Sequence, residues 1–485
     1  MRLGLLIVVL VLGLVTASWA AKDDTRLVSR AAGAAGAKAN AAATIGAISA
    51  DGRVIAFDSL ATNLDAADLD ATRDVFLRDA QAGTTTLVSR AAGAGGAAAN
   101  ANSFAARVSA GGRFVAFSSI ATNLHPDDAD GLSDVFVRDL QTATVRLASR
   151  ATGLAGPKDN GGASTPAISA DGRFVAFASV GTNLPGDPDT TSDVFVRDLE
   201  TGTTTLVSRA TGVAGAKGNS VSFAPAISAD GRLVSFTSAA TNLDPGDADP
   251  VQDVYVRDVQ AATTTLVSRA TGVAGVKGNA VSTQAQVAAG GRFVVFLSAA
   301  NNLTPETVGE AGQIFRRDLQ TATTTLVSRA SGPAGAPAAD GVLASSISAD
   351  GRLVGFGSTA TNLHADDADA TSDAFLRDLQ ATTTTLLSRA SGAAGAKGNA
   401  ASGGPAISGD GRVVAFGSFA TNLDPDDGDA TADVFTRELG AAQPPRASRR
   451  PACPRAGPER RPQDPGRPRR PGSRPLPDVQ SAFSR

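Results

Sequence analysis

The sequence predicts an all-β fold, a seven-bladed β-propeller of four-stranded antiparallel blades. A ten-residue phrase of the type ISADGRFVAF recurs seven times, at intervals of 59 or 60 residues. Each repeat contains four short segments rich in apolar and β-branched residues and bounded by turn residues, and none has a helical period. A fixed period with four strands per unit is typical of blades that surround a central channel.

The chain begins with the features of a secretory signal peptide. Arg2 precedes an apolar run, Leu3–Val15, and Ala20 ends a segment that fits a cleavage site. An uncleaved membrane anchor would need a longer apolar run, and no later segment could span a bilayer. We therefore predict a signal peptide over 1–20, a propeller over 21–439, and export to the periplasm or the medium. The single cysteine predicts no disulfide framework.

The third repeat shows the four predicted strands most clearly. They are Thr165–Ser169, Arg173–Ser179, Asp193–Leu199 and Thr203–Arg209. The first and second strands are joined by an Asp-Gly turn, and the third and fourth by Glu-Thr-Gly, in which glycine supplies a positive φ. The connections from the second to the third strand (the acidic loops) and from the fourth strand to the next repeat (the linking loops) are longer. Antiparallel order places both at one end of the ring, the long-loop face, where function is expected.

The two ends of the repeat region are complementary. Thr25–Arg30 reads as a lone fourth strand, and the seventh repeat has a third strand, Asp433–Leu439, but no fourth. We expect these two segments to pair and close the ring, which leaves no long unpaired edge.

Aromatic residues predict the core. A phenylalanine ends every second strand, and a phenylalanine or tyrosine lies in every third strand. Repetition at every blade favours packing over ligand stacking. The predicted core aromatics are Phe57, Phe117, Phe177, Phe236, Phe296, Phe356 and Phe416 of the second strands and Phe76, Phe136, Phe195, Tyr255, Phe315, Phe375 and Phe435 of the third.

Six acidic loops share the spacing D-x-D-x-x-x-D, and the fifth repeat has Thr307, Gly309 and Gln313 instead. Clustered carboxylates suit Ca²⁺, although the spacing is not that of an EF-hand. The alternative is a solvated acidic turn that caps the third strand. The candidate Ca²⁺ ligands are Asp68, Asp70 and Asp74; Asp128, Asp130 and Asp134; Asp187, Asp189 and Asp193; Asp247, Asp249 and Asp253; Asp367, Asp369 and Asp373; and Asp427, Asp429 and Asp433.

Other charged positions also recur. Five linking loops carry K-x-N, and we expect their lysines to form weak exposed pairs with the acidic loops. The Arg-Asp pair that recurs in the third strands, such as Arg197-Asp198, is expected to join adjacent strands. The two histidines, His125 and His364, replace other residues at one loop position and are expected to face solvent.

No catalytic motif of the serine, zinc or Cys-His classes is present. Little breaks the repeat as a single active site would: Glu306 and Glu310 are local to the fifth repeat, and no carboxylate pair stands out from the surrounding aspartates. We therefore assign no catalytic residue and no organic cofactor. Residues 440–485 are rich in Arg and Pro, with eleven arginines and no interleaved aromatics. They predict a disordered tail or a frame-shifted reading of a GC-rich gene, and no nucleic-acid partner.

The phrases ISADGRFVAFAS and DVFVRDLETGTTTLVS resemble the TolB-like, WD-like propeller repeats of exported bacterial proteins, over Thr25–Leu439. The resemblance implies a propeller and leaves activity open, and the chain has no room for the N-terminal α/β domain of TolB proper. We expect a monomeric, non-enzymatic scaffold that binds a protein, peptide or glycan through the long-loop face. The alternative is a propeller hydrolase or lyase that uses loop carboxylates.

Overall fold

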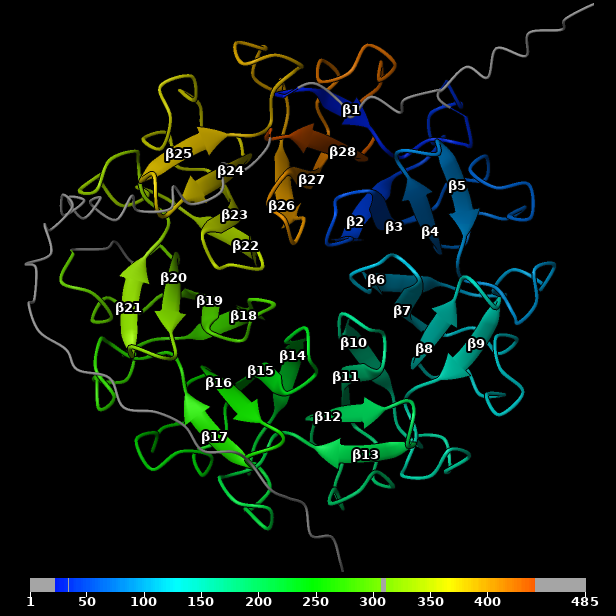
Figure 1. Cartoon of the computed structure of the whole chain (residues 1–485), viewed down its shortest axis with the longest axis vertical. Helices are drawn as coiled ribbons and strands as arrows, with labels where there is room; N and C mark the ends of the chain where they lie inside the picture. The colour runs from blue at the N-terminus through cyan, green and yellow to red at the C-terminus, as the bar shows by residue number, and fades with distance from the viewer. Residues whose placement is uncertain (1–21, 34, 307–310, 441–485) are drawn as a thin grey trace, which may run out of the picture. The chain divides into compact units, whose positions relative to one another are not determined.

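Every repeat folds into one four-stranded antiparallel sheet (Figure 1). The structure, a computed structural model, describes residues 22–33, 35–306 and 311–440. The chain divides into two compact units, Met1–Ala442 and Gln443–Arg485, and all described residues lie in the first. The predicted signal peptide and all but the first residue of the predicted tail lie outside the described residues.

The strands of each blade follow one another from the centre of the ring to its outside (Figure 1). The innermost strands are β2 (Ala43–Ile48), β6 (Ser103–Val108), β10 (Ala163–Ile168), β14 (Ser222–Ile227), β18 (Ser282–Val287), β22 (Val342–Ile347) and β26 (Ser402–Ile407). The second strands are β3 (Val54–Ser59), β7 (Phe114–Ser119), β11 (Phe174–Ser179), β15 (Leu233–Ser238), β19 (Phe293–Ser298), β23 (Leu353–Ser358) and β27 (Val413–Ser418). The third strands are β4 (Asp74–Asp79), β8 (Asp134–Asp139), β12 (Asp193–Asp198), β16 (Asp253–Asp258), β20 (Gln313–Asp318), β24 (Asp373–Asp378) and β28 (Asp433–Glu438). The outermost strands are β5 (Thr84–Leu87), β9 (Thr144–Leu147), β13 (Thr203–Leu206), β17 (Thr263–Leu266), β21 (Thr323–Leu326), β25 (Thr383–Leu386) and β1 (Thr25–Leu27).

We number the blades from blade 1 (β2 to β5) to blade 7, which consists of β26, β27, β28 and β1. In blade 7 the N-terminal strand pairs with the last strand, with Thr25 opposite Arg437 and Leu27 opposite Phe435. The seven-bladed propeller and its closure by the N-terminal strand are therefore confirmed. Closure joins residues about 400 positions apart, so the ring has no free edge between its first and last blades.

The recurring phrase forms the hairpin between the two inner strands. In blade 3 the Ser169 hydroxyl and the backbone N–H of Arg173 both donate hydrogen bonds to Asp171 Oδ1, at 2.5 and 2.9 Å. Gly172 has a φ of +79°, a conformation that favours glycine. The phrase is thus a turn and a strand of the scaffold.

The aromatic core lies between the second and third strands of each blade, as predicted. The two rings of every blade stack with centroids 5.7 to 5.9 Å apart, and all fourteen are fully buried. Each hydrophobic cluster also joins neighbouring blades. One cluster, for example, unites Val194 and Val196 of blade 3 with Phe236 and Tyr255 of blade 4. Stability therefore comes from continuous packing around the ring.

The linking loops cover the outer edges of the blades. Arg197 on β12 donates hydrogen bonds to three main-chain carbonyls of the preceding linking loop, within 150–153, at 2.7 to 3.1 Å. The Thr152 hydroxyl accepts a hydrogen bond from the N–H of Thr204 on the outermost strand. Arg197 also donates to the Thr204 hydroxyl of the adjacent strand β13 at 2.8 Å, and Asp198 pairs with Arg173, which precedes the adjacent strand β11, at 2.7 Å. The Arg-Asp pair therefore joins adjacent strands, as predicted, and its arginine joins adjacent blades as well. The fourth strand of this blade was predicted to reach Arg209. The observed strand, β13, ends at Leu206, where the chain turns toward the next blade.

No helix among the described residues is long and apolar enough to cross a membrane.

Candidate functional site

The acidic loop and the linking loop of each blade meet at the long-loop face and are held together by asparagine side chains. In blade 3 the N–H of Asn160 donates to Asn183 Oδ1, the N–H of Thr182 donates to Asn160 Oδ1, and Asn183 Nδ2 donates to the carbonyl of Lys158, at 2.7 to 3.1 Å. The same pattern recurs in other blades. The K-x-N motif of the linking loop was recognised in the sequence, but its partner in the acidic loop, T-N-L, was not.

The three aspartates of each triad lie together. In five triads one carboxylate oxygen from each aspartate lies within 4.8 Å of the other two. The first and third aspartates are buried and the second is exposed. The third aspartate starts a strand and accepts a hydrogen bond from the serine that follows the outermost strand, such as Ser208 on Asp193 at 2.6 Å. The predicted grouping therefore exists, and its carboxylates could bind a metal ion.

A lysine ammonium lies among the three carboxylates in five blades. Its Nζ is 2.7 to 2.9 Å from the third aspartate, 2.9 to 3.0 Å from the second and 3.4 to 3.8 Å from the first. The lysine side chains are only 11 to 16% exposed. The expected Lys-Asp pairs are thus present, but as partly buried clusters. The five lysines are Lys158, Lys217, Lys277, Lys397 and, across the ring closure, Lys38.

Burial dominates the titration of these clusters. It raises the pKa of Asp134 to about 6, although hydrogen bonds from Lys158 and Ser149 oppose the shift. Burial alone would lower the pKa of Lys158, but its hydrogen bonds to Asp134 and Asp130 outweigh this and raise it. The ammonium is therefore firmly charged and balances part of the carboxylate charge.

Blade 5 has lost all three aspartates and the lysine. Gln313 replaces the third aspartate, and its amide donates to the carbonyl of Ala338 and accepts from Ser328, at 3.0 and 2.7 Å. Pro337 occupies the lysine position. Thr307 and Gly309 lie outside the described residues.

Blade 1 has lost only the lysine. Its triad is complete, but Ala98 stands 24 residues after Asp74, where blades 2, 3, 4 and 6 have lysine 24 residues after the third aspartate. Burial raises the pKa of Asp68 to about 6 and that of Asp74 to about 7, and neighbouring aspartates raise both further. No lysine or arginine among the described residues lies within 4 Å of these carboxylates, so this triad differs electrostatically from the other five.

Blade 1 departs from the repeat in a second way, through a buried aspartate and its arginine partner. Asp58 on β3 is buried, and its Oδ2 is 3.3 Å from the guanidinium of Arg73. Burial raises the pKa of Asp58 to about 6, while Arg73 and Arg107 lower it. Sequence reasoning missed this pair, although it was visible there: other repeats have small or apolar residues in place of Asp58 and none has an arginine in place of Arg73.

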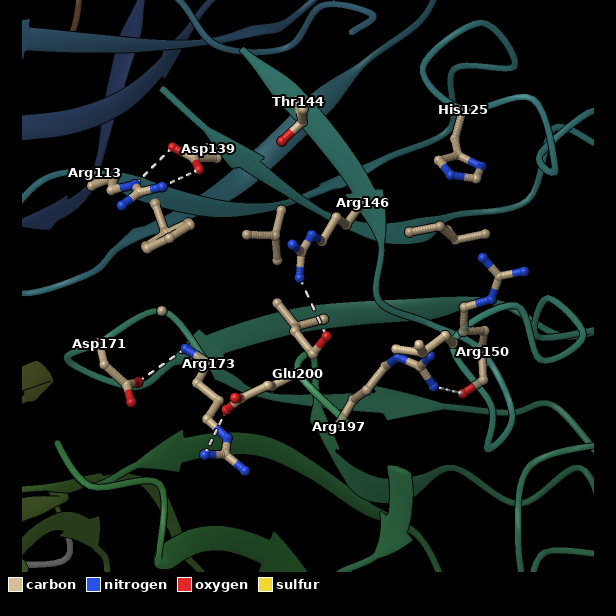
Figure 2. Close-up of a pocket in the computed structure, with 16 residues that line it drawn as sticks. Arg113, His125, Asp139, Thr144, Arg146, Arg150, Asp171, Arg173, Arg197 and Glu200 are labelled. Atoms are coloured by element: carbon tan, nitrogen blue, oxygen red, sulfur yellow. Dashed lines mark hydrogen bonds and ion pairs between the residues drawn. The ribbon is translucent and has the colours of Figure 1, made fainter. Parts of the chain in front are cut away.

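A groove of about 610 Å³ lies between blades 2 and 3 (Figure 2). Part of its lining comes from turn residues at the end of the ring opposite the long-loop face. Its arginines already have partners: Arg113 pairs with Asp139 at 2.6 Å, and Arg173 pairs with Glu200 at 2.7 Å. Arg146 donates to the carbonyl of Leu199 at 3.2 Å. The groove is therefore lined by paired charges.

His125 also lines this groove, and its side chain is only 19% exposed. The Nδ1 atom accepts the N–H of Asp127 at 3.2 Å, and Nδ1 of His364 accepts the N–H of Asp366 in the same way. Where other repeats have aspartate, as at Asp65, a carboxylate oxygen accepts the equivalent N–H. The histidines therefore shape the acidic loop and do not simply face solvent.

No protein-family model and no curated protein matches the chain. Solved structures do match. Oligogalacturonate lyase from Vibrio parahaemolyticus is 12% identical, with 86% of this chain and 98% of that chain covered and a TM-score of 0.50. TolB from Acinetobacter baumannii is 11% identical, with 73% of this chain covered and a TM-score of 0.38; the match spans 65% of that chain. Structures similar to this chain thus include TolB proteins and propeller enzymes, and at these identities the likeness concerns the fold alone.

Proposed function

We propose that this chain is an exported, non-enzymatic propeller that binds a protein, peptide or glycan partner through its long-loop face. The observation that carries the proposal is a set of large exposed apolar side chains at this end, at two repeat positions whose residue type varies from blade to blade. Val180 and Phe419 follow the second strands of blades 3 and 7, and Val221 and Val281 precede the innermost strands of blades 4 and 5; all four are 38 to 49% exposed. Leu69 in the first acidic loop is 86% exposed.

These residues border the innermost strands. The N–H of Val180 donates to the carbonyl of Gly162, and the N–H of Phe419 donates to the carbonyl of Ala401, each across the start of an innermost strand. Exposed apolar groups on a rigid scaffold, rimmed by carboxylates and asparagines, are typical of interaction surfaces. The apolar character favours a protein or peptide over a glycan.

Export rests on the sequence of residues 1–20. We further propose that Ca²⁺ orders acidic loops of this face, because clustered carboxylates provide the hard oxygen ligands that Ca²⁺ prefers. Peptide sequencing of the N-terminus of the exported protein tests the first part: a chain that still begins at Met1 would contradict cleavage.

Substitution of exposed apolar residues by aspartate tests the binding face. The biotin-labelled protein is cross-linked in the envelope fraction and in the medium of its host, and partners are identified by mass spectrometry. A V180D/F419D variant should lose the partner. The matched control V213D/V273D changes two valines that are 83 and 84% exposed. They follow Gly212 and Gly272, whose N–H groups donate to carbonyls of the turns between third and fourth strands, at the end of the ring opposite the long-loop face, so this control should retain the partner. Equal capture by both variants, or none by the native chain, would refute the proposed face.

The rival function is a hydrolase or lyase that uses loop carboxylates. It is favoured by Asp58, Asp68 and Asp74, whose raised pKa values of about 6, 6 and 7 suit proton transfer near neutrality. A screen of acidic and neutral glycans and of peptides distinguishes the two functions. Turnover that is abolished by Asp74→Asn and unchanged by Asp193→Asn would replace the binding proposal.

A further inference from the structure

The position of the missing lysine in blade 1 is fixed by the backbone. Ala98 pairs with Arg90 in the same single bridge that joins Lys158 to Arg150 in blade 2. Asn123 Nδ2 donates to the carbonyl of Ala98 at 2.7 Å, as Asn183 Nδ2 does to that of Lys158. The loops therefore match, and the lysine side chain alone is removed.

The carboxylates of blade 1 keep the geometry of a cation cluster. Oxygens of Asp68, Asp70 and Asp74 lie within 4.8 Å of one another. Asp68 is 1% exposed, and neither of its oxygens makes a hydrogen bond of ordinary geometry, although the N–H of Asp70 lies near it. Asp74 is fully buried and accepts a hydrogen bond from Ser89. The nearby Arg73 pairs with Asp58.

Acid and base otherwise occur together in the repeats. Five blades keep the three aspartates with the lysine, and blade 5 has lost all three aspartates and the lysine together. Buried carboxylates without a counter-charge are costly, which explains this pairing. Only blade 1 keeps the carboxylates alone, so its charge needs another source of compensation.

We infer that Asp68, Asp70 and Asp74 of blade 1 form a binding site for one divalent cation of hard character, Ca²⁺, and that lysine ammonium groups fill the corresponding positions of five other blades. Three carboxylates supply up to six oxygens, and water completes the six to eight ligands that Ca²⁺ takes. The inference rests on the proposed role of Ca²⁺ and assigns it to one blade; it does not depend on the partner.

Calorimetric titration of the purified exported chain with CaCl₂ tests the site. We expect one Ca²⁺ per chain. Ala98→Lys restores the residue of the other blades and should weaken binding at least 100-fold. D68N should also weaken binding, whereas D187N, which changes the equivalent aspartate beside Lys217, should leave the one-ion stoichiometry unchanged.

A gain-of-site variant completes the test. Lys217→Ala gives blade 3 the charges of blade 1 and should raise the stoichiometry to two, with circular dichroism used to verify folding. No Ca²⁺ binding at millimolar concentration, more than one ion bound to the native chain, or undiminished binding by A98K would each overturn the inference. If K217A does not fold even with Ca²⁺, the A98K and D68N titrations decide. Partner capture is measured separately, so failure of the ion site and failure of the binding face are distinguishable.

Discussion

Blades 1 and 2 offer a comparison within one molecule. Both have four strands, a stacked aromatic pair and an aspartate triad at the start of the third strand. In blade 2 the Nζ atom of Lys158 is 2.7 Å from Asp134, whereas in blade 1 Ala98 takes the place of the lysine. The blades thus share packing and differ in charge compensation, which teaches that the repeat fixes the scaffold while single side chains set the chemistry of each loop pair.

The largest expected effect on stability concerns blade 7. This blade has the lysine cluster of blade 2, but its outermost strand and its lysine come from the N-terminal end of the described residues. Deletion of 23–30 removes β1 and detaches Lys38 from its carboxylates. Loss of the buried Leu27 and Val28 alone should lower the free energy of unfolding by about 3 to 6 kcal/mol. Thermal denaturation followed by circular dichroism should show a lower midpoint and a broader transition. The exposed Arg26→Ala serves as control, and an unchanged melting curve for the deletion would contradict closure by this strand.

The next effect converts blade 2 into a copy of blade 1. Lys158→Ala leaves three carboxylates, two of them buried, without their ammonium. Removal of one partner of a buried ion cluster should cost about 3 kcal/mol in urea unfolding at neutral pH without Ca²⁺. Addition of Ca²⁺ should recover part of this loss. Lys158→Met keeps the apolar stem and separates lost packing from lost charge. Equal stability of K158A and the native chain would show that the lysine contributes nothing.

The reverse change, Ala98→Lys, should stabilise the chain in a pH-dependent way. Asp68 and Asp74 have folded-state pKa values of about 6 and 7, above the usual value near 4. Between pH 4 and pH 7 the folded state therefore binds more protons than the unfolded state, and the native chain loses stability as the pH rises. The lysine should oppose this loss, so melting temperatures measured without Ca²⁺ should differ more at pH 7.5 than at pH 4.5. A difference independent of pH would argue against uncompensated carboxylates.

The smallest effect compares the turns between third and fourth strands. Gly202 of blade 3 has a φ of +73°, and Ala262 of blade 4 holds nearly the same conformation at +56°. A Cβ atom is disfavoured there, so Ala262→Gly should stabilise the chain by up to about 1 kcal/mol. Gly202→Ala is the converse control and should destabilise it. Urea midpoints measure both, and stabilisation by G202A would show that the turn tolerates Cβ.

The sequence carried most of the fold because its signals were local and repeated seven times. Each strand, each short turn and the aromatic core could be predicted from one repeat, and closure followed from matching the two ends. The triads could also be grouped from spacing alone. Their surroundings could not, because Lys158 lies 24 residues after Asp134 and its burial depends on how two loops fold together. The expectation of weak exposed pairs failed for that reason, and the expectation of solvent-facing histidines failed because His125 folds back onto its own loop.

The sequence by itself determined the number of blades, the order of their strands and the residues of the core, since periodicity and turn chemistry act over a few residues. Only the tertiary structure decided which charges meet. Lys38 finds Asp433 across the whole chain, Arg197 finds the carbonyls of the preceding blade, and Ala98 leaves Asp68 and Asp74 without a cation. Electrostatic energy depends on distance and burial in space, and both are settled only when the ring has closed.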